Sequence, residues 1–478
     1  MKSDKLQDAI GMVDPDLVQK AEIKNNTKKS KIITIKWVAP VAAVVAICIA
    51  IGVFFPFGNN PLKPNTGSVS NSMIKAEYRA QYPIMTQYDE NNHAQWVEDR
   101  RKQLDYSGAG KNLDSFFQST ISEFLNDDNG ENKLYSPVNV YMALAMVAEI
   151  TDSDSRQQIL DLLNADSIDA LRKQAHSIWN ANYCDDGVTK SVLASSLWLS
   201  DDMEYNEQTI QNLLNNYYAS AFSGKMGSDE YSKLYKEWLN EQTGGLLKDQ
   251  IDKKALDERT IMAIATTLYF KAQWDSFFSK SNTTKSQFNS VDGVVTCDFM
   301  NQTISNGEYY WGDNFSAVRK SINGSGHMYF ILPDKDISTQ SLLSDKEAVN
   351  FMTNSANWKN TKNLQINLSL PKFDVNSQID LIDGLKNLGV TDCFDSAKSD
   401  FSPLISQVDE VYIDKASHGV RVSIDEEGVT GAAYTEIGLL NGATLPKEEI
   451  DFVVDRPFVF VVTGADNLPL FVGVVNQM

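Results

Sequence analysis

The sequence predicts an α+β domain preceded by one membrane-spanning helix. Three observations support this fold class. From Asn112 onward apolar residues recur at spacings of three and four, as in a helix, while later segments such as Val192–Leu199 and Ala263–Phe270 are rich in strand-forming residues. These helical and strand segments do not alternate regularly, which disfavours a parallel sheet built from βαβ units. The third observation is an uncharged run of 21 residues near the N-terminus.

This uncharged run covers residues 37–57 and reads WVAPVAAVVAICIAIGVFFPF. A helix of about 20 apolar residues spans a bilayer. The 20 residues before the run contain six lysines and the 20 after it contain two. Because positive charge stays inside, we expect residues 1–36 in the cytoplasm and the bulk of a single-pass cell-membrane protein outside. A cleaved signal peptide is the alternative, but a basic region of 36 residues and the lack of an A-x-A site disfavour it.

The composition excludes several classes of function. Lys and Arg total 43 against 63 Asp and Glu, and the net charge of −20 disfavours a nucleic-acid partner. Four cysteines without C-x-x-C spacing and only four histidines disfavour a disulfide framework, a metal site and a histidine-based catalytic triad. No GxxxxGK[ST] or GxSxG motif occurs. We therefore expect no metal, no cofactor and no enzymatic activity, and the few cysteines fit a bacterial exported protein.

Four parts follow from these patterns. Residues 1–36 form a cytoplasmic segment of undetermined role, and residues 37–57 form the membrane span. Residues 58–111 form an extracellular linker and N-terminal extension, because residues 58–71 are rich in Gly, Pro, Asn and Ser and a charged helical stretch surrounds Gln95–Leu104. Residues 112–478 form the single α+β domain.

The segment Ile424–Leu445, IDEEGVTGAAYTEIGLLNGATL, alternates in polarity although it is rich in small residues. One face of an extended chain would hold only small or apolar residues, namely Val429, Gly431, Ala433, Thr435, Ile437 and Leu439. The opposite face would hold Tyr434 and Glu436. This pattern is typical of a strand with one buried and one solvated face. An ordinary Gly/Ala-rich loop is the alternative.

Seven short motifs follow one another between Asn112 and the C-terminus. They are NKLYSP at 132–137 with ALAM at 143–146, WL…TGG at 238–245, YFKAQW at 269–274, LPKF at 370–373, LKNLGVTDCF at 385–394, DEEGVTGAA at 425–433, and DRPFVF at 455–460 with LFVG at 470–473. In this order they resemble the serpins, the serine protease inhibitor superfamily. The resemblance implies a monomeric domain of about nine helices and three β-sheets with an exposed reactive loop.

The resemblance also assigns residues. The hinge of the reactive loop falls on Glu426, Glu427, Gly428, Val429, Thr430, Gly431, Ala432 and Ala433. Counting 17 residues from Glu426 places the reactive bond at Gly442–Ala443, with Leu440–Asn441 and Asn441–Gly442 as alternatives. A polar cluster that controls opening of the main sheet falls on Ser136, Asn139, Thr266 and His418. Thr266 stands where the family has asparagine, so this network should be weaker.

Serpins act as suicide substrates, and the resemblance therefore implies inhibition of extracellular serine endopeptidases, with cysteine endopeptidases left open. The cleaved loop would insert into the main sheet and trap the acyl-enzyme. No Arg or Lys lies between Glu426 and Pro446, which favours an elastase-, subtilisin- or chymotrypsin-like target over a trypsin-like one. The alternative is a non-inhibitory serpin that acts as a binding or scaffold module at the cell surface.

Overall fold

The computed structural model describes residues 45–54, 76–89, 91–107, 113–126, 130–323, 326–428 and 448–478. Contacts divide the chain into two units, residues 1–40 and 41–478, and all described residues belong to the second. The expected cytoplasmic segment 1–36 and the tether 58–71 lie outside the described residues.

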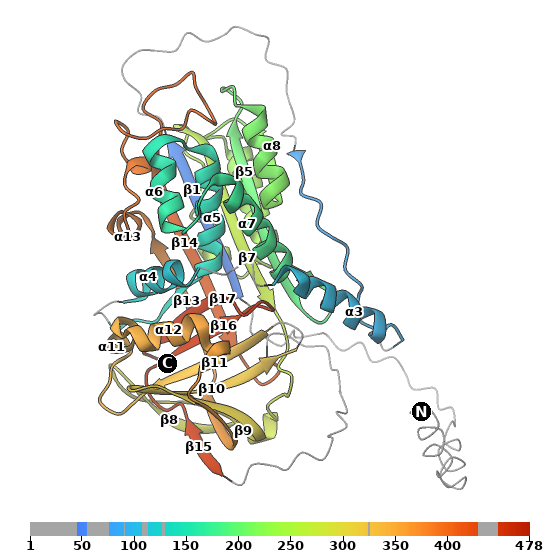
Figure 1. Cartoon of the computed structure of the whole chain (residues 1–478), viewed down its shortest axis with the longest axis vertical. Helices are drawn as coiled ribbons and strands as arrows, with labels where there is room; N and C mark the ends of the chain where they lie inside the picture. Colours follow the sequence, from blue (N-terminus) through green and yellow to red (C-terminus); the bar gives the residue numbers. More distant parts are fainter. Residues whose placement is uncertain are drawn as a thin grey trace. The chain divides into compact units, whose positions relative to one another are not determined.

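An eight-stranded sheet, here called sheet A, forms the centre of the domain (Figure 1). Its order is β13-β14-β1-β7-β5-β6-β2, with β4 paired to β5. The strands are β1 (Val45–Phe54), β2 (Ala76–Tyr78), β4 (Cys184–Asp185), β5 (Lys190–Ser200), β6 (Ala219–Gly224), β7 (Thr260–Lys271), β13 (Phe373–Asp380) and β14 (Tyr412–Ile424). Since β1 is antiparallel to both β7 and β14, the latter two run in the same direction on either side of it.

A second, nine-stranded sheet has the order β15-β12-β9-β10-β11-β16-β17-β3, with β8 paired to β9. Its strands are β3 (Lys133–Tyr135), β8 (Thr284–Ser290), β9 (Gly293–Trp311), β10 (Phe315–Ile322), β11 (Gly326–Pro333), β12 (Thr361–Pro371), β15 (Glu449–Val453), β16 (Phe458–Thr463) and β17 (Pro469–Val475). The long strand β9 pairs with β8 and β12 and also with β10. It thereby joins two of the three expected sheets into one hydrogen-bonded unit.

Eleven α-helices occur in the described residues, with four short 3₁₀ turns. The helices are α3 (His93–Gln103), α4 (Asp114–Leu125), α5 (Pro137–Ile150), α6 (Ser153–Leu162), α7 (Ile168–Asn182), α8 (Glu207–Tyr217), α9 (Asp229–Gln242), α10 (Lys248–Ile251), α11 (Thr339–Ser344), α12 (Lys346–Asn354) and α13 (Ile382–Asn387). The 3₁₀ turns are η1 (Leu104–Tyr106), η2 (Lys280–Asn282), η3 (Ser355–Asn357) and η4 (Asp392–Phe394). Nine of the helices remain when α3, which precedes the domain, and the single turn α10 are set aside.

Helix α5 packs on one face of sheet A, over β1 and β7, and its apolar residues belong to the hydrophobic core (Figure 1). All 14 of its residues are buried, including the polar residues Asn139 and Glu149. A helix that is apolar all round is stable only when it is surrounded by protein or lipid. Glu149 is paired with Arg172 of α7, which satisfies its charge within the core. Because α5 contacts β1, β7 and β17, it links both sheets.

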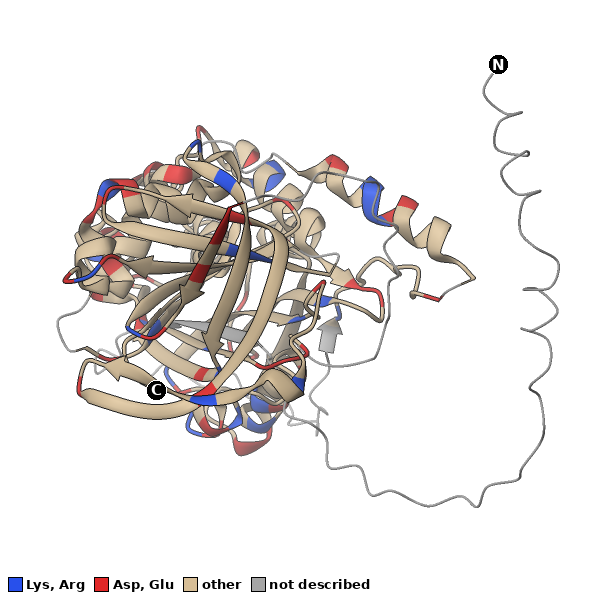
Figure 2. Ribbon diagram, turned by 90° about the horizontal axis from the view of Figure 1, so that it is seen from below, with Lys and Arg blue, Asp and Glu red and all other residues tan. Residues whose placement is uncertain are grey.

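The N-terminal extension forms a strap over the described ranges 76–89 and 91–107. It adds β2 to the edge strand β6 and then continues into α3, the helix expected around Gln95–Leu104. Trp96 donates its ring N–H to Asp186 at 2.8 Å, and Arg100 lies 3.8 Å from the same buried carboxylate. The outer side of α3 carries charges of both signs (Figure 2). The strap is thus fixed to the domain by a mostly buried charged pair.

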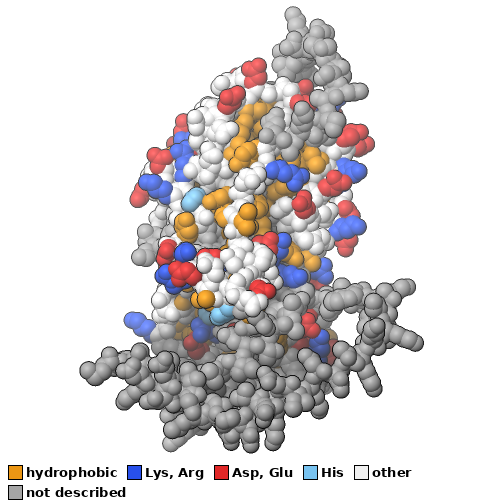
Figure 3. Space-filling model, turned by 90° about the vertical axis from the view of Figure 1, so that its right-hand side faces the viewer, with side chains coloured by type: hydrophobic (Ala, Val, Ile, Leu, Met, Phe, Trp, Pro, Cys, Tyr) orange, Lys and Arg blue, Asp and Glu red, His pale blue; other side chains and the backbone are white. Residues whose placement is uncertain are grey.

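One face of the molecule carries a band of hydrophobic side chains flanked by charged ones (Figure 3). Large apolar residues of the strap are among those more than a third exposed, namely Tyr78, Ile84, Val97, Leu104 and Tyr106.

The predicted membrane-spanning helix over residues 37–57 is wrong for the described part of this run. Val45–Phe54 form the strand β1, and no helix in the described ranges is long and apolar enough to cross a membrane. The reason is that a continuous apolar run fits a strand buried on both faces as well as a helix in lipid. Val or Ile occupies every second position from Val45 to Val53, and this period of two favours a strand.

Candidate functional site

The predicted polar cluster begins at the N-terminus of α5. Ser136 is the N-cap: its Oγ accepts a hydrogen bond from the backbone N–H of Asn139 at 3.3 Å and donates one to the carbonyl of Leu470 at 2.6 Å. Pro137 follows at the first helical position, where proline needs no hydrogen bond. The local sequence Ser-Pro therefore starts the helix here and ties it to β17.

His418 of β14 is fully buried beside this cap. Its Nε2 accepts the backbone N–H of Ser136 at 3.0 Å, so the neutral ring carries its proton on Nδ1. Burial, with a smaller contribution from the positive charge of Lys254, lowers the pKa of His418 to about 3. The histidine is therefore neutral at physiological pH and acts as a hydrogen-bond acceptor between β14 and α5.

Thr266 of β7 joins the cluster only through its backbone. Asn139 donates its side-chain amide to the carbonyl of Thr266 at 3.5 Å. Among the described residues neither the Thr266 hydroxyl nor Nδ1 of His418 has a hydrogen-bond partner. The reason is topological, because Ile49 of β1 pairs directly with both Thr266 and His418 and so separates the two strands. The structure brings Ser136, Asn139 and His418 together, whereas it holds Thr266 one strand away from His418.

The predicted hinge starts where β14 ends at Ile424. Asp425–Gly428 form a tight turn in which the N–H of Glu427 bonds to the carboxylate of Asp425 at 2.9 Å. Gly428 has a φ of 99°, and a Cβ on it would lie 2.3 Å from the backbone nitrogen of Trp274. Glycine is therefore required at this position both by conformation and by space.

Backbone and ring hydrogen bonds hold this turn against the chain that follows β7. The ring N–H of Trp274 donates to the carbonyl of Asp425 at 2.9 Å. The backbone N–H of Phe278 donates to the carbonyl of Glu426 at 3.0 Å. The hinge is thus attached at the mouth of the space between β7 and β14, which β1 occupies.

The Glu426 carboxylate adds an ionic anchor. It lies 2.6 Å from Nζ of Lys372 and accepts the hydroxyl of Thr283 at 2.6 Å. Burial alone would raise its pKa, but these two hydrogen bonds outweigh burial and hold the pKa of Glu426 below its usual value. Glu427 pairs with Lys280 nearer the surface. The turn is therefore tied to two segments of the chain, the stretch from Trp274 to Thr283 and Lys372 between β12 and β13.

Lys320 beneath the hinge was not predicted from sequence. Its Nζ donates to the Ser276 carbonyl and to Oε1 of Gln302, both at 2.6 Å, and lies 4.4 Å from the centre of the Phe278 ring. Burial lowers the pKa of Lys320 to about 7. The available signal was its position in β10, where it shares the inward face with Val318 and Ile322. A lysine at an inward strand position indicates a specific buried partner.

The remaining loop residues of the prediction lie outside the described residues. These are Val429, Thr430, Gly431, Ala432 and Ala433 of the hinge, and Leu440, Asn441, Gly442 and Ala443 around the reactive bond. Their roles stay predictions of the sequence.

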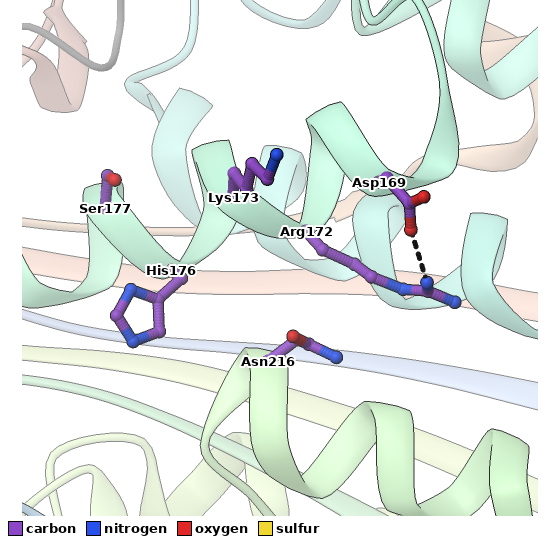
Figure 4. A pocket seen from close by; sticks show the side chains of 6 residues that line it. All are labelled: Asp169, Arg172, Lys173, His176, Ser177 and Asn216. Atoms are coloured by element: carbon purple, nitrogen blue, oxygen red, sulfur yellow. Dashed lines mark hydrogen bonds and ion pairs between the residues drawn. The ribbon is translucent and has the colours of Figure 1, made fainter.

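A separate hollow of about 490 Å³ lies between α7 and α8 and is lined by Asp169, Arg172, Lys173, His176, Ser177 and Asn216 (Figure 4). Arg172 is already engaged by Asp169 at 2.7 Å and by Glu149. The hollow is remote in sequence from the hinge and from the polar cluster. In the described ranges no group of three or more His, Cys, Asp or Glu side chains is arranged to hold a metal ion.

Comparison with known proteins identifies the family. The model of the family "Serpin (serine protease inhibitor)" matches residues 111–478. The chain belongs to the serpin family. Plasminogen activator inhibitor 1 of Bos taurus is 26% identical over 396 residues, which cover 78% of this chain and 93% of that protein. Serpin-ZX of Arabidopsis thaliana is 26% identical over 382 residues, which cover 76% of this chain and 95% of Serpin-ZX.

Solved structures agree on the fold. The thermophilic serpin tengpin in its native state superposes with a TM-score of 0.67 at 24% identity, covering 85% of this chain and all of tengpin. The Arabidopsis serpin AtSerpin1, in a native stressed conformation, gives a TM-score of 0.64 at 24% identity. The match covers 79% of this chain and 98% of the AtSerpin1 chain. Serpins in general inhibit proteases and are not catalysts, although some members are non-inhibitory.

The buried Glu426 carboxylate should contribute measurably to stability. Glu426→Ala leaves Lys372 and Thr283 without their acceptor, and charged hydrogen bonds of this kind contribute about 1.5–3 kcal/mol. We expect the free energy of unfolding, measured by urea titration, to fall by about 2 kcal/mol. The matched control is Glu448→Ala, which removes the exposed pair with Lys362 and should cost less than about 0.5 kcal/mol. Equal effects of the two variants would contradict the anchoring role of Glu426.

His418 should make stability depend on pH. Its pKa in the folded chain, about 3, lies below the ordinary value of 6.5, so the unfolded chain binds the extra proton. Stability is therefore lost as pH falls from about 6.5 toward 3, by roughly 3 kcal/mol at pH 4. We therefore compare the free energy of unfolding at pH 7 and at pH 4, measured by urea titration. Between these two pH values, the loss of stability in His418→Gln should be smaller than that of the natural chain by roughly 3 kcal/mol.

Two features make this measurement specific. His327 and Asp466, whose pKa values are displaced to about 4 and about 6 by burial, titrate in both chains and cancel in the comparison. His93→Gln is the matched substitution at an exposed position of α3, and His418→Gln should differ from it in the pH dependence of stability. Parallel pH profiles for the natural chain and His418→Gln would refute the assignment.

Proposed function

We propose that this serpin is a suicide-substrate inhibitor of extracellular serine endopeptidases. One observation carries the proposal beyond family membership: sheet A accepts a strand between β7 and β14, antiparallel to both. A loop that leaves β14 at Ile424 and turns back at Gly428 would enter that position in the same antiparallel direction. The position between β7 and β14 therefore takes a strand in the direction in which the loop would enter, once β1 has left it.

The chemistry follows from the proposed bond Gly442–Ala443. The protease serine attacks the Gly442 carbonyl, an ester forms, and the peptide bond to Ala443 breaks as its nitrogen takes the proton lost by the serine. The freed segment then enters sheet A and carries the attached protease with it. Roughly a dozen new backbone hydrogen bonds at ~1 kcal/mol net each would exceed the cost of displacing one oxyanion-hole donor, about 3–4 kcal/mol. Water then cannot complete deacylation.

The target class follows from the loop sequence. The proposed loop holds no Arg or Lys between Glu426 and Pro446. A protease whose specificity pocket carries an aspartate would therefore find no basic side chain to bind. We propose an elastase-, subtilisin- or chymotrypsin-like protease as the partner.

The test is to mix the full chain with a subtilisin-like and an elastase-like protease. We expect a complex that survives boiling in SDS. We also expect a released C-terminal peptide whose mass shows that it begins at Ala443. Trypsin is the comparison protease and should form less complex. A nicked chain accompanied only by fully active protease would reject inhibition.

Loop insertion should depend on the face at which a charge is placed. Val429→Arg puts a cation on the face predicted to be buried, where an unpaired charge is costly. We expect the variant to be cleaved with little or no complex, measured as the number of serpin molecules consumed per protease inhibited. Thr430→Arg places the same charge on the opposite face and should inhibit nearly as well as the natural chain. Equal behaviour of the two variants would contradict the predicted alternation.

For location we propose the outer face of a cell membrane, supported by the six lysines before residue 37 against two after residue 57. Because residues 45–54 cannot pair within sheet A and span a bilayer in the same molecule, this location requires that β1 has left sheet A. External protease should therefore remove the serpin domain from intact cells, and the chain should stay with membranes after a high-salt wash. Recovery of the whole chain in the aqueous fraction would reject this location.

A second candidate function is a non-inhibitory serpin, and one observation favours it. The strand position needed by the cleaved loop is already occupied by β1. A chain in which that occupation were permanent would be cleaved without trapping its protease.

A further inference from the structure

The occupant of the insertion position belongs to the chain's own N-terminal region. Residues Ala46–Phe54 pair with Tyr412–Arg421 of β14, and Val45–Phe54 pair with Thr260–Phe270 of β7. Both edges of the opening are therefore hydrogen-bonded to β1 over nearly its whole length. The pairing is regular except for a shift near Gly52 and Val53.

The sequence of β1 fits a central strand. Val45, Ile47, Ile49, Ile51 and Val53 alternate with the small residues Ala46, Cys48, Ala50 and Gly52. Residues directly opposite one another lie on the same face of a sheet. The register pairs position 47 with Leu268 and Val420 and position 51 with Ile264, and all three of these partners are buried. This alternation resembles that of the reactive loop, where small or apolar residues from Val429 to Leu439 occupy every second position.

We propose that Val45–Phe54 is a built-in competitor for the position that the cleaved reactive loop must enter. A molecule with β1 in sheet A is cleaved as an ordinary substrate, and a molecule with β1 withdrawn traps its protease. The inference rests on the proposed inhibitory function, because competition matters only if the loop inserts.

Mutual exclusion follows from backbone hydrogen bonding. Each strand edge offers one row of N–H and C=O groups, and those of β7 and β14 that face each other are used by β1. The loop can pair with the same two edges only after β1 has left. The polar cluster is consistent with this, since Ile49 lies between Thr266 and His418 at the point where those two strands would otherwise meet.

The strap keeps the competitor close to its site. Only residues 55–75 separate β1 from β2, and the strap is fixed to the domain through β6 and through Asp186. A linker of this length gives an effective concentration on the order of millimolar. Return of β1 to the sheet is therefore an intramolecular event that competes with loop insertion in every molecule.

The first experiment tests where β1 lies. Cys48 is opposite Thr267 of β7, and directly opposed residues of antiparallel strands have Cα atoms about 4.5–5.5 Å apart, which suits a disulfide. The full chain carrying Thr267→Cys should form a disulfide between Cys48 and the cysteine introduced at position 267 under mild oxidation, detected by mass spectrometry of the joined peptides. Ala263→Cys is the matched control, because it shares the face but pairs with Gly52. Absence of the link between positions 48 and 267, or equal linking at position 263, would overturn the placement of β1.

The second experiment tests competition. Ile49→Pro removes a backbone donor from the middle of β1 and is incompatible with a central strand, whereas Ile49→Val keeps a β-branched residue there. With the same serine protease, we expect Ile49→Pro to lower the number of serpin molecules consumed per protease inhibited by at least about threefold, toward one. Ile49→Val should behave as the natural chain. An unchanged ratio in Ile49→Pro would overturn the inference while leaving the inhibitory function intact.

The disulfide also provides a reversible test in one molecule. The oxidised Thr267→Cys chain holds β1 in place and should yield cleaved serpin without complex, and reduction should restore complex formation. Complex formation by the oxidised, linked chain would overturn the competition. If the link forms but neither the reduced chain nor Ile49→Pro forms any complex, the failure is that of the proposed inhibitory function and the location of β1 stands.

Discussion

The constraint on which the structure depends is that the facing edges of β7 and β14 must each find a hydrogen-bonding partner. The two strands run in the same direction, and helix α5 packs against β7 and against the strand between them. Unpaired backbone groups in such a place are costly. In this chain β1 supplies both sets of hydrogen bonds. The polar cluster, the hinge and the strap are all arranged around this one strand position.

The residues around the strand position of β1 have different structural roles. Beside the middle of β1, His418 accepts a hydrogen bond from the N-cap residue of α5 and so links β14 to that helix. At its mouth the turn Asp425–Gly428 is held by Trp274 and by the Glu426–Lys372 pair. Lys320 supports the segment under this turn from within the core. The first residues of the predicted hinge are therefore held at one end of the strand position that β1 occupies.

The seven motifs predicted the family, the class of fold and the helices and strands that carry the site. The structure brings Ser136, Asn139 and His418 together, because each lies in or directly beside a regular element whose neighbours the fold determines. Thr266 could not be placed relative to His418 from sequence, since their separation depends on which strand lies between them. Lys320 was missed because its partners Ser276 and Gln302 are distant in sequence and meet only in the folded core.

The sequence by itself determined the serpin family and the α+β fold class, and its motifs predicted where the hinge and the reactive loop lie. These features are local, since they depend on short motifs and on which residue types stand in order. Only the tertiary structure decided what Val45–Phe54 does. An uncharged run of β-branched and small residues satisfies its backbone equally well as a helix in lipid or as a strand between two others. The choice depends on whether two open strand edges are within reach, and that is a property of the folded domain.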